Sequence, residues 1–241
     1  MEANTGTVRT VVVLGPVRTE TMADYDLRAR SMQAQVTVIG PDDRLVTDAV
    51  AIGKDTWFRI TRTEGADAKQ TCWMHADPAA IEETTGVDLP GGGGRGIPAG
   101  VIVALTASGR TQIDPDRVLG GVDIYSLSTA FSGKLPLMMG IDIDTTAIAP
   151  VVIDLEAGVV TGWRSSLVDL LGAVEDAGLE LPSELQAYDD ASMADASVDV
   201  ELSELGTPVS VAPPPADQTV ELSADQEQFA QDRQECEARQ G

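Results

Sequence analysis

The sequence has 241 residues, with 39 acidic side chains against 16 Lys and Arg, which gives a formal net charge of -23 at pH 7. This charge argues against nucleic acid and anionic membrane surfaces as partners, because proteins bind both through Lys and Arg that neutralise phosphates. We interpret the acidity as a solubility feature of an extracellular or salty setting rather than as a cation site. The sequence contains no stretch of about 18 apolar residues, so it predicts no membrane span. The length suits one large β-rich domain, which we expect, or two small ones.

The first residues, MEANTGTV, contain neither the basic nor the apolar region of a secretory leader. Two interpretations fit this N-terminus: a cytosolic protein, or a mature domain without its leader. Composition does not separate the two.

Two cysteines, Cys72 and Cys236, lie far apart in the sequence. In an oxidising compartment they could form one disulfide that ties the C-terminal tail to the body of the protein. Two unrelated thiols are about equally consistent with the sequence, since the spacing says nothing about their distance. No metal site is expected, because His75 is the only histidine and no cysteine pair has zinc-finger spacing.

Short antiparallel strands joined by tight turns are predicted for the N-terminal part of the chain. Apolar and polar residues alternate with a period of two over long stretches, which is typical of half-buried strands. The segment from Met22 to Val38 reads as one strand, with a break near Ser31. The predicted strands cover residues 8–14, 22–38, 45–52 and 56–62.

Two short helices are predicted between the strands. The first covers 78–85, with Asp77 as its N-cap and Pro78 at its first position. The second covers 166–177 and begins with a capping-box variant, Ser166 followed by Asp169. The stretch from 99 to 109 fits either a strand or a helix. The glycine-rich stretch from 89 to 98 is interpreted as a flexible loop, because no Gly-Lys-Ser/Thr motif follows it.

Strand patterns return in the second half of the chain. A strand is predicted from about 122 to 131, and a hairpin turn around Glu156 to Gly158. The segment SVDVELSELGTPVSVAPPPADQTVEL, from 197 to 222, alternates in the same way. It predicts the last strand pair, with a bend at 206–208 and a sheet edge after the prolines at 213–215. Residues 223–241 are predicted to form a helical or disordered C-terminal tail.

These elements amount to about eight to ten short antiparallel strands with a few amphipathic helices. They predict an α+β fold: an open, strongly curved antiparallel sheet, or half-barrel, with helices covering its concave face.

Three segments, VDIYSLSTAFSG, VVIDLEAGVVTGWR and VDVELSELGTPVSVAPPPADQTVEL, resemble the actinobacterial cell-envelope lipoproteins of the LolA-like superfamily, in particular the LppX/LprG type. The resemblance covers roughly residues 7–222, and 1–222 is therefore expected to be one LolA-like lipoprotein domain. The positions that match the family pattern are Gly121, Val122, Tyr125, Glu204, Leu205, Gly206, Pro208, Val209, Pro214, Pro215, Ala216 and Asp217.

The resemblance implies a half-open barrel with an apolar cavity for acyl chains. It also implies an extracytoplasmic location at the outer face of the plasma membrane, with a membrane tether through a lipidated leader cysteine that is not in this sequence. The ligand would be a lipid or lipoglycan, held without any cofactor, and a monomer is expected.

Acyl chains need only an apolar pocket, because burial of each methylene contributes about 0.8 kcal/mol. The candidate cavity residues are large, apolar and near the predicted helices. They are Trp57, Phe58, Trp73, Phe131, Leu137, Met138, Met139, Leu167, Leu170 and Leu171. Each of these residue types is, taken singly, more often ordinary core than cavity wall.

No catalytic signature is visible, and the protein is not expected to be an enzyme. Asp142 and Asp144 share one face of a predicted strand, which we interpret as a solvated face. Two functions stay open. One is a carrier or chaperone of envelope lipids. The other is a cell-wall interaction or sensor ectodomain on the same scaffold, with a filled core and no lipid.

Overall fold

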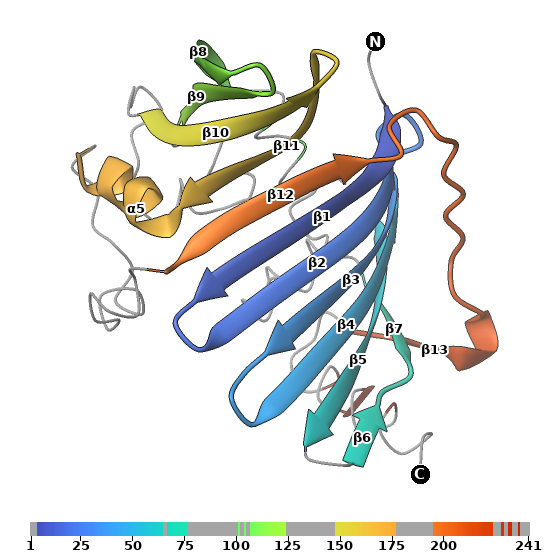
Figure 1. Cartoon of the computed structure of the whole chain (residues 1–241). Helices are drawn as coiled ribbons and strands as arrows, with labels where there is room; N and C mark the ends of the chain where they lie inside the picture. The colour runs from blue at the N-terminus through green and yellow to red at the C-terminus, as the bar shows by residue number, and fades with distance from the viewer. Residues whose placement is uncertain are drawn as a thin grey trace. The chain divides into compact units, whose positions relative to one another are not determined.

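A computed structural model of the chain is shown in Figure 1. The structure describes residues 4–64, 67–76, 101, 104, 107–123, 148–176, 195–223, 228, 231, 232 and 236. The chain divides into two compact units. Unit 1 comprises Met1–Thr7, Thr21–Ile97 and Glu204–Gly241, and unit 2 comprises Val8–Glu20 and Pro98–Ser203. Each unit is described by itself below.

The expected α+β class, with helices covering a concave face, is wrong. The described residues are 66% strand and 10% helical, and the strands form a large mixed sheet. The physical reason is that nearly every apolar run is followed by a tight turn, so that it pairs with its neighbour in a sheet ladder. One predicted helix does form, as α5 (Leu167–Asp176), and it packs against strands of unit 2.

In unit 1 the strands follow the order β13-β7-β5-β4-β3-β2-β1, and β6 pairs with β5. The β3–β4, β4–β5 and β5–β7 pairs are antiparallel, whereas β13 lies parallel to β7. Strands β1 and β2 continue into unit 2. The bounds are β1 (Thr5–Leu14), β2 (Val17–Asp26), β3 (Ser31–Ile39), β4 (Asp43–Ile52), β5 (Asp55–Glu64), β6 (Asp67–Gln70), β7 (Trp73–Ala76) and β13 (Thr219–Glu221).

The strand predicted from 22 to 38, with a break near Ser31, is two strands, β2 and β3, and β3 begins at Ser31. Asp26 ends β2, and its carboxylate accepts hydrogen bonds from the backbone N–H groups of Arg28 and Ala29, both at 2.9 Å. Arg30 then adopts a φ of 51°. An Asp side chain that captures the following N–H groups in this way favours a turn over a continuing strand.

In unit 2 the order is β1-β12-β11-β10-β9-β8. The bounds are β8 (Ser108–Asp114), β9 (Arg117–Asp123), β10 (Ile148–Glu156), β11 (Val159–Ser166) and β12 (Ser197–Ser203). β9 overlaps the strand predicted from about 122 to 131 only at its first two residues, and 124–131 lie outside the described residues. The predicted hairpin between β10 and β11 is confirmed. Ala157 and Gly158 have φ values of 50° and 79°, as a two-residue turn between twisted strands requires.

The core of unit 2 lies on one face of these strands. Ile153, Trp163 and Val200 are direct cross-strand partners on β10, β11 and β12, and all three are buried. The residues between them in each strand point to the opposite face, because successive side chains of a strand alternate. That opposite face is called the outer face of unit 2 below.

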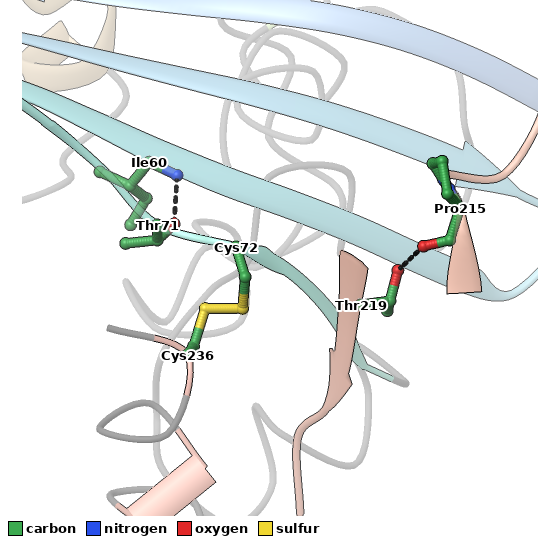
Figure 2. The surroundings of a disulfide bond; sticks show 6 residues. All are labelled: Ile60, Thr71, Cys72, Pro215, Thr219 and Cys236. Carbon is green, nitrogen blue, oxygen red and sulfur yellow. Dashed lines mark hydrogen bonds between the residues drawn. A yellow bond between two sulfur atoms is a disulfide. The ribbon is translucent and has the colours of Figure 1, made fainter. Parts of the chain in front are cut away.

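In unit 1 a buried cluster lies on one face of β5, β7 and β13, and its members are Ala49, Phe58, Cys72, Met74, Ala76, Val220, Leu222 and Cys236. Cys72 and Cys236 form a disulfide, shown in Figure 2. Of the two interpretations of the cysteines, the structure has the bonded one. The neighbouring Thr71 is fixed on β5 by its hydroxyl, which accepts the N–H of Ile60 at 2.9 Å.

The end of the chain differs from its prediction. β12 forms where the alternation predicts a strand, but Glu204 and Gly206 then turn the backbone with φ values of 51° and 83°. Residues 207–215 form no strand, so the predicted second half of the pair at Val209 and Val211 is wrong. The sheet also continues after the prolines. The 3-10 helix η1 (Ala216–Gln218) leads into β13, and the Thr219 hydroxyl donates to the Pro215 carbonyl at 2.9 Å (Figure 2).

Several predictions lie outside the described residues. These are the helix at 78–85, the glycine-rich loop at 89–98, and the carboxylates of Asp142 and Asp144. In the part of the chain that the structure describes, no helix has the length and apolar character to cross a membrane.

Candidate ligand-binding groove

The predicted cavity residues are not brought together where the structure describes them. Phe58 lies in the buried cluster of unit 1. Trp57 is its neighbour on β5 and therefore points to the opposite face, as does Trp73 on β7. Phe131, Leu137, Met138 and Met139 lie outside the described residues, and only the backbone of Leu167, Leu170 and Leu171 is described, in α5. Their role in a cavity stays a prediction.

Trp57 on β5 and His75 on β7 are cross-strand partners. The two rings stack with their centroids 4.5 Å apart and an interplanar angle of 18°. His75 Nδ1 lies 2.6 Å from the Glu221 carboxylate on β13, and His75 Nε2 lies 3.6 Å from Asp55. The only histidine of the sequence thus helps to fasten the edge strand β13 to β7.

Trp73 on β7 makes a second cross-strand contact on the same face, with Arg59 on β5. The Arg59 guanidinium lies 4.8 Å from the centroid of the Trp73 ring, a cation–π distance. Asp48 on β4 accepts a hydrogen bond from Arg59 Nε at 2.8 Å. Cross-strand pairs of this kind stabilise sheets. We therefore assign both tryptophans to the cohesion of β4, β5, β7 and β13.

A groove of about 380 Å³ lies on unit 2. Its position is set by the register of four strands, in which Leu119, Val152, Arg164 and Asp199 are successive cross-strand partners. These four side chains share the outer face. The volume is within the usual range of about 300 to 1,000 Å³ for small-molecule sites.

One side of the groove is apolar. Leu119, Pro150 and Val152 line it, and the Leu119 side chain is 42% exposed although it is large and hydrophobic. Ile148, which is 53% exposed, lies on the same face and would touch any side chain added at Gly121. These residues give a ligand an apolar surface that water otherwise covers.

The other side of the groove is polar and acidic. Asp169 comes from the first turn of α5, Asp195 precedes β12, and Asp199 lies within it. Ser197 donates a hydrogen bond to Asp199 at 3.2 Å. Arg164 also lines this side, and its Nη2 lies 2.9 Å from Asp154 Oδ1. Among the described residues that line this side, carboxylates therefore outnumber cationic side chains.

The floor of the groove is held by close contacts between neighbouring strands. The Ser165 hydroxyl donates to the Pro150 carbonyl at 2.7 Å and so ties β11 to β10. At Gly162 a Cβ atom would come 2.4 Å from the Val200 carbonyl oxygen. Only glycine lets β11 and β12 approach this closely, and their spacing sets the positions of Arg164 and Asp199.

The groove combines two kinds of surface. Among the described residues, no three His, Cys, Asp or Glu side chains are placed so that they could hold a metal ion. What the groove offers is an apolar wall beside hydrogen-bond acceptors and negative charge. A ligand with an apolar part and a polar head matches both sides.

The groove residues were missed in the sequence. Leu119 stands in an ordinary strand pattern, and nothing local shows that it faces solvent rather than core. Asp169 and Asp195 are separated by residues whose placement no pattern fixes. A usable signal is IAPVVIDLE at 148–156, in which apolar residues occupy both faces of a strand.

No protein-family model matches this chain, and no curated protein matches its sequence.

Proposed function

We propose that this protein is a non-enzymatic extracytoplasmic domain that binds the acyl part of a lipid or lipoglycan, as a carrier or chaperone of envelope lipids. The observation that carries the proposal is the groove of unit 2, in which the exposed apolar side chains of Leu119 and Pro150 and the half-buried Val152 lie beside a polar end. Each methylene that settles on this wall contributes up to about 0.8 kcal/mol.

Two further observations support the proposal. The Cys72–Cys236 disulfide fits an oxidising compartment outside the cytoplasm. His75, the single histidine, is engaged with Trp57 and Glu221 at a sheet edge. A histidine in that role supports a binding function rather than acid–base catalysis.

An alternative function is supported by exposed apolar side chains on three neighbouring strands of unit 2. Ile113, Leu119 and Ile148 are 52%, 42% and 53% exposed on β8, β9 and β10. Exposed apolar side chains of this size are also typical of surfaces that dock a protein partner. In that case the domain acts as an interaction or sensor ectodomain and binds no lipid.

Native mass spectrometry after mild extraction tests the two against each other. The carrier function predicts a co-purifying amphiphile, and it predicts that added alkyl amphiphiles bind at one site. Leu119→Ser should weaken this binding by about tenfold, because it removes most of one apolar contact surface. Val159→Ser is the matched control, since Val159 is 53% exposed and does not line the groove.

Absence of any bound amphiphile from the extracted protein and from titrations would contradict the carrier function and favour the ectodomain. Equal loss of binding in Leu119→Ser and Val159→Ser would show that the amphiphile binds elsewhere.

A further inference from the structure

The two ring nitrogens of His75 have different surroundings. Nδ1 lies 2.6 Å from a carboxylate oxygen of Glu221 on β13. A carboxylate only accepts hydrogen bonds, so Nδ1 carries a proton and donates it to Glu221. In the part of the chain that the structure describes, His75 Nε2 is buried and has no hydrogen-bond partner. One nitrogen thus binds the edge strand, and the other is left without a partner.

The position of Asp55 on β5 favours a second proton on this ring. Its Oδ1 atom lies 3.6 Å from His75 Nε2, beyond hydrogen-bond distance but within the range of an ion pair. In the neutral ring only one nitrogen is protonated, so Nε2 presents a lone pair to the carboxylate. A buried acceptor without a donor is also unfavourable. Protonation of Nε2 replaces both unfavourable contacts with an ion pair.

The ring contact of His75 favours the same charge state. The Trp57 ring stacks on His75 with the centroids 4.5 Å apart, and a cation over an indole face is attracted to it. A positive charge on His75 is therefore stabilised through the ring face as well as through the ring nitrogens.

The charged groups around His75 are acidic on both sides of its strand. β7 lies between β13 and β5. Among the described residues, Glu221 faces the ring from β13 and Asp55 faces it from β5. Arg59, which lies further along β5, is held by Asp48 at 2.8 Å. The arrangement matches an imidazolium between two carboxylates.

β13 is the element that this charge would hold in place. It pairs with β7 over only three residues, and the Leu222 N–H donates to the His75 carbonyl at 2.8 Å. Val220 and Leu222 belong to the buried cluster of unit 1, as does Cys236, which is bonded to Cys72. Local opening of β13 would therefore uncover part of that cluster, while the disulfide keeps the chain attached.

We propose that His75 is a pH-dependent latch that fastens β13 in acid and loosens it as the pH rises. In the closed state the imidazolium bridges Asp55 and Glu221. Histidine loses its second proton between about pH 5 and 8, and the contact with Asp55 then becomes unfavourable. The closed strand holds this proton better than the open one, so its stabilising contribution is present in acid and is lost as the pH rises. The latch belongs to unit 1 and does not depend on the groove of unit 2.

Hydrogen exchange of the Leu222 amide tests the latch on the full chain. After correction for the intrinsic exchange rate, its protection should be about fivefold greater near pH 5 than near pH 8, the upper range for one partly exposed ion pair. Amides of the β3–β4 pair report changes in overall stability and serve as the control. Equal protection of Leu222 at the two pH values would overturn the proposal, as would an identical change in the β3–β4 amides.

Three variants assign the effect to the ring and its acidic partner. His75→Gln should abolish the pH dependence of Leu222 protection. Asp55→Asn should reduce it strongly, because the Asn amide can donate to the neutral Nε2. Asp42→Asn removes the same charge from an exposed position in the turn before β4 and should leave the pH dependence unchanged. Full pH dependence in His75→Gln, or an equal reduction in the two Asp variants, would overturn the proposal.

The ring itself gives a measurement that needs no variant. His75 is the only histidine, so the nitrogen signals of its imidazole are unambiguous in a 15N NMR spectrum. Above about pH 8, where an ordinary histidine is neutral, we expect the proton on Nδ1. A proton on Nε2 would overturn the proposal, because Nδ1 could then not donate to Glu221.

Discussion

Cys72 and Cys236 are 164 residues apart in the sequence, and their Cα atoms lie 5.3 Å apart in the structure. The bond joins the residue just before β7 to the C-terminal segment, and both cysteines are buried in the cluster that contains Phe58 and Met74. A cross-link over so long a loop restricts the unfolded chain strongly.

The first prediction follows from this loop. Reduction, or the double substitution Cys72→Ser and Cys236→Ser, should lower the free energy of unfolding by about 2 to 5 kcal/mol. Denaturant unfolding with and without reductant measures the loss, and the double serine variant, which should not respond to reductant, is the control. If reduction left the free energy of unfolding unchanged, the disulfide would not stabilise the fold.

The second prediction concerns two glycines of unit 2 that differ in the space around them. Gly162→Ala places a Cβ atom against the Val200 carbonyl oxygen, a backbone atom that cannot move aside. We expect a destabilisation of about 1 to 3 kcal/mol. Gly172→Ala in α5 meets no atom within 4 Å and should stabilise by up to about 1 kcal/mol through helix propensity.

Thermal or denaturant unfolding of the two variants gives the comparison directly. If the free energy of unfolding fell in both variants, or rose in both, the result would contradict the close approach of β11 and β12. Loss of amphiphile binding in Gly162→Ala alone would also be consistent with that approach, since it sets the spacing of Arg164 and Asp199.

The third prediction concerns acid titration of Glu20. The Arg9 guanidinium donates a hydrogen bond to the Glu20 carboxylate at 2.7 Å, and this bond lowers the pKa of Glu20 below its ordinary value of 4.5. Since the pKa is lower in the folded state, the stabilising contribution is present above the unfolded value. It is lost as the pH falls through the lower folded value.

NMR titration of the side-chain carboxyl groups measures this directly. Arg9→Gln should raise the pKa of Glu20 toward its ordinary value. Arg18→Gln is the control, because Arg18 Nη2 is 3.7 Å from the carboxylate and should have a smaller effect. A larger change with Arg18→Gln than with Arg9→Gln would contradict the assignment.

The strands with regular alternation could be predicted from the sequence. β4, β5 and β12 form where apolar and polar residues alternate, and the turn at Gly158 forms where a positive φ is required. Local patterns suffice in these places because strand, turn and burial all agree. The disulfide could be predicted only as one of two equal alternatives, since the distance between distant residues is a property of the fold.

Other parts of the fold depend on contacts that no local pattern encodes. β13 has only three residues and pairs in parallel with β7, about 145 residues away along the chain, because Val220 and Leu222 enter a buried cluster there. The predicted α+β class was wrong because apolar and polar residues alternate in the same way in a sheet that carries helices on one face and in a larger sheet that does not. The groove likewise depends on the register that places Leu119 beside Val152.

The most direct test of the proposed function is photo-crosslinking with an alkyl amphiphile that carries a diazirine in its chain, followed by peptide mass spectrometry. The groove predicts labels on β9 and β10, at Leu119, Pro150 or Val152, and fewer labels in Leu119→Ser. Labels confined to the face of Trp57 and Trp73, or distributed without preference over both units, would contradict the assignment of the lipid site to unit 2.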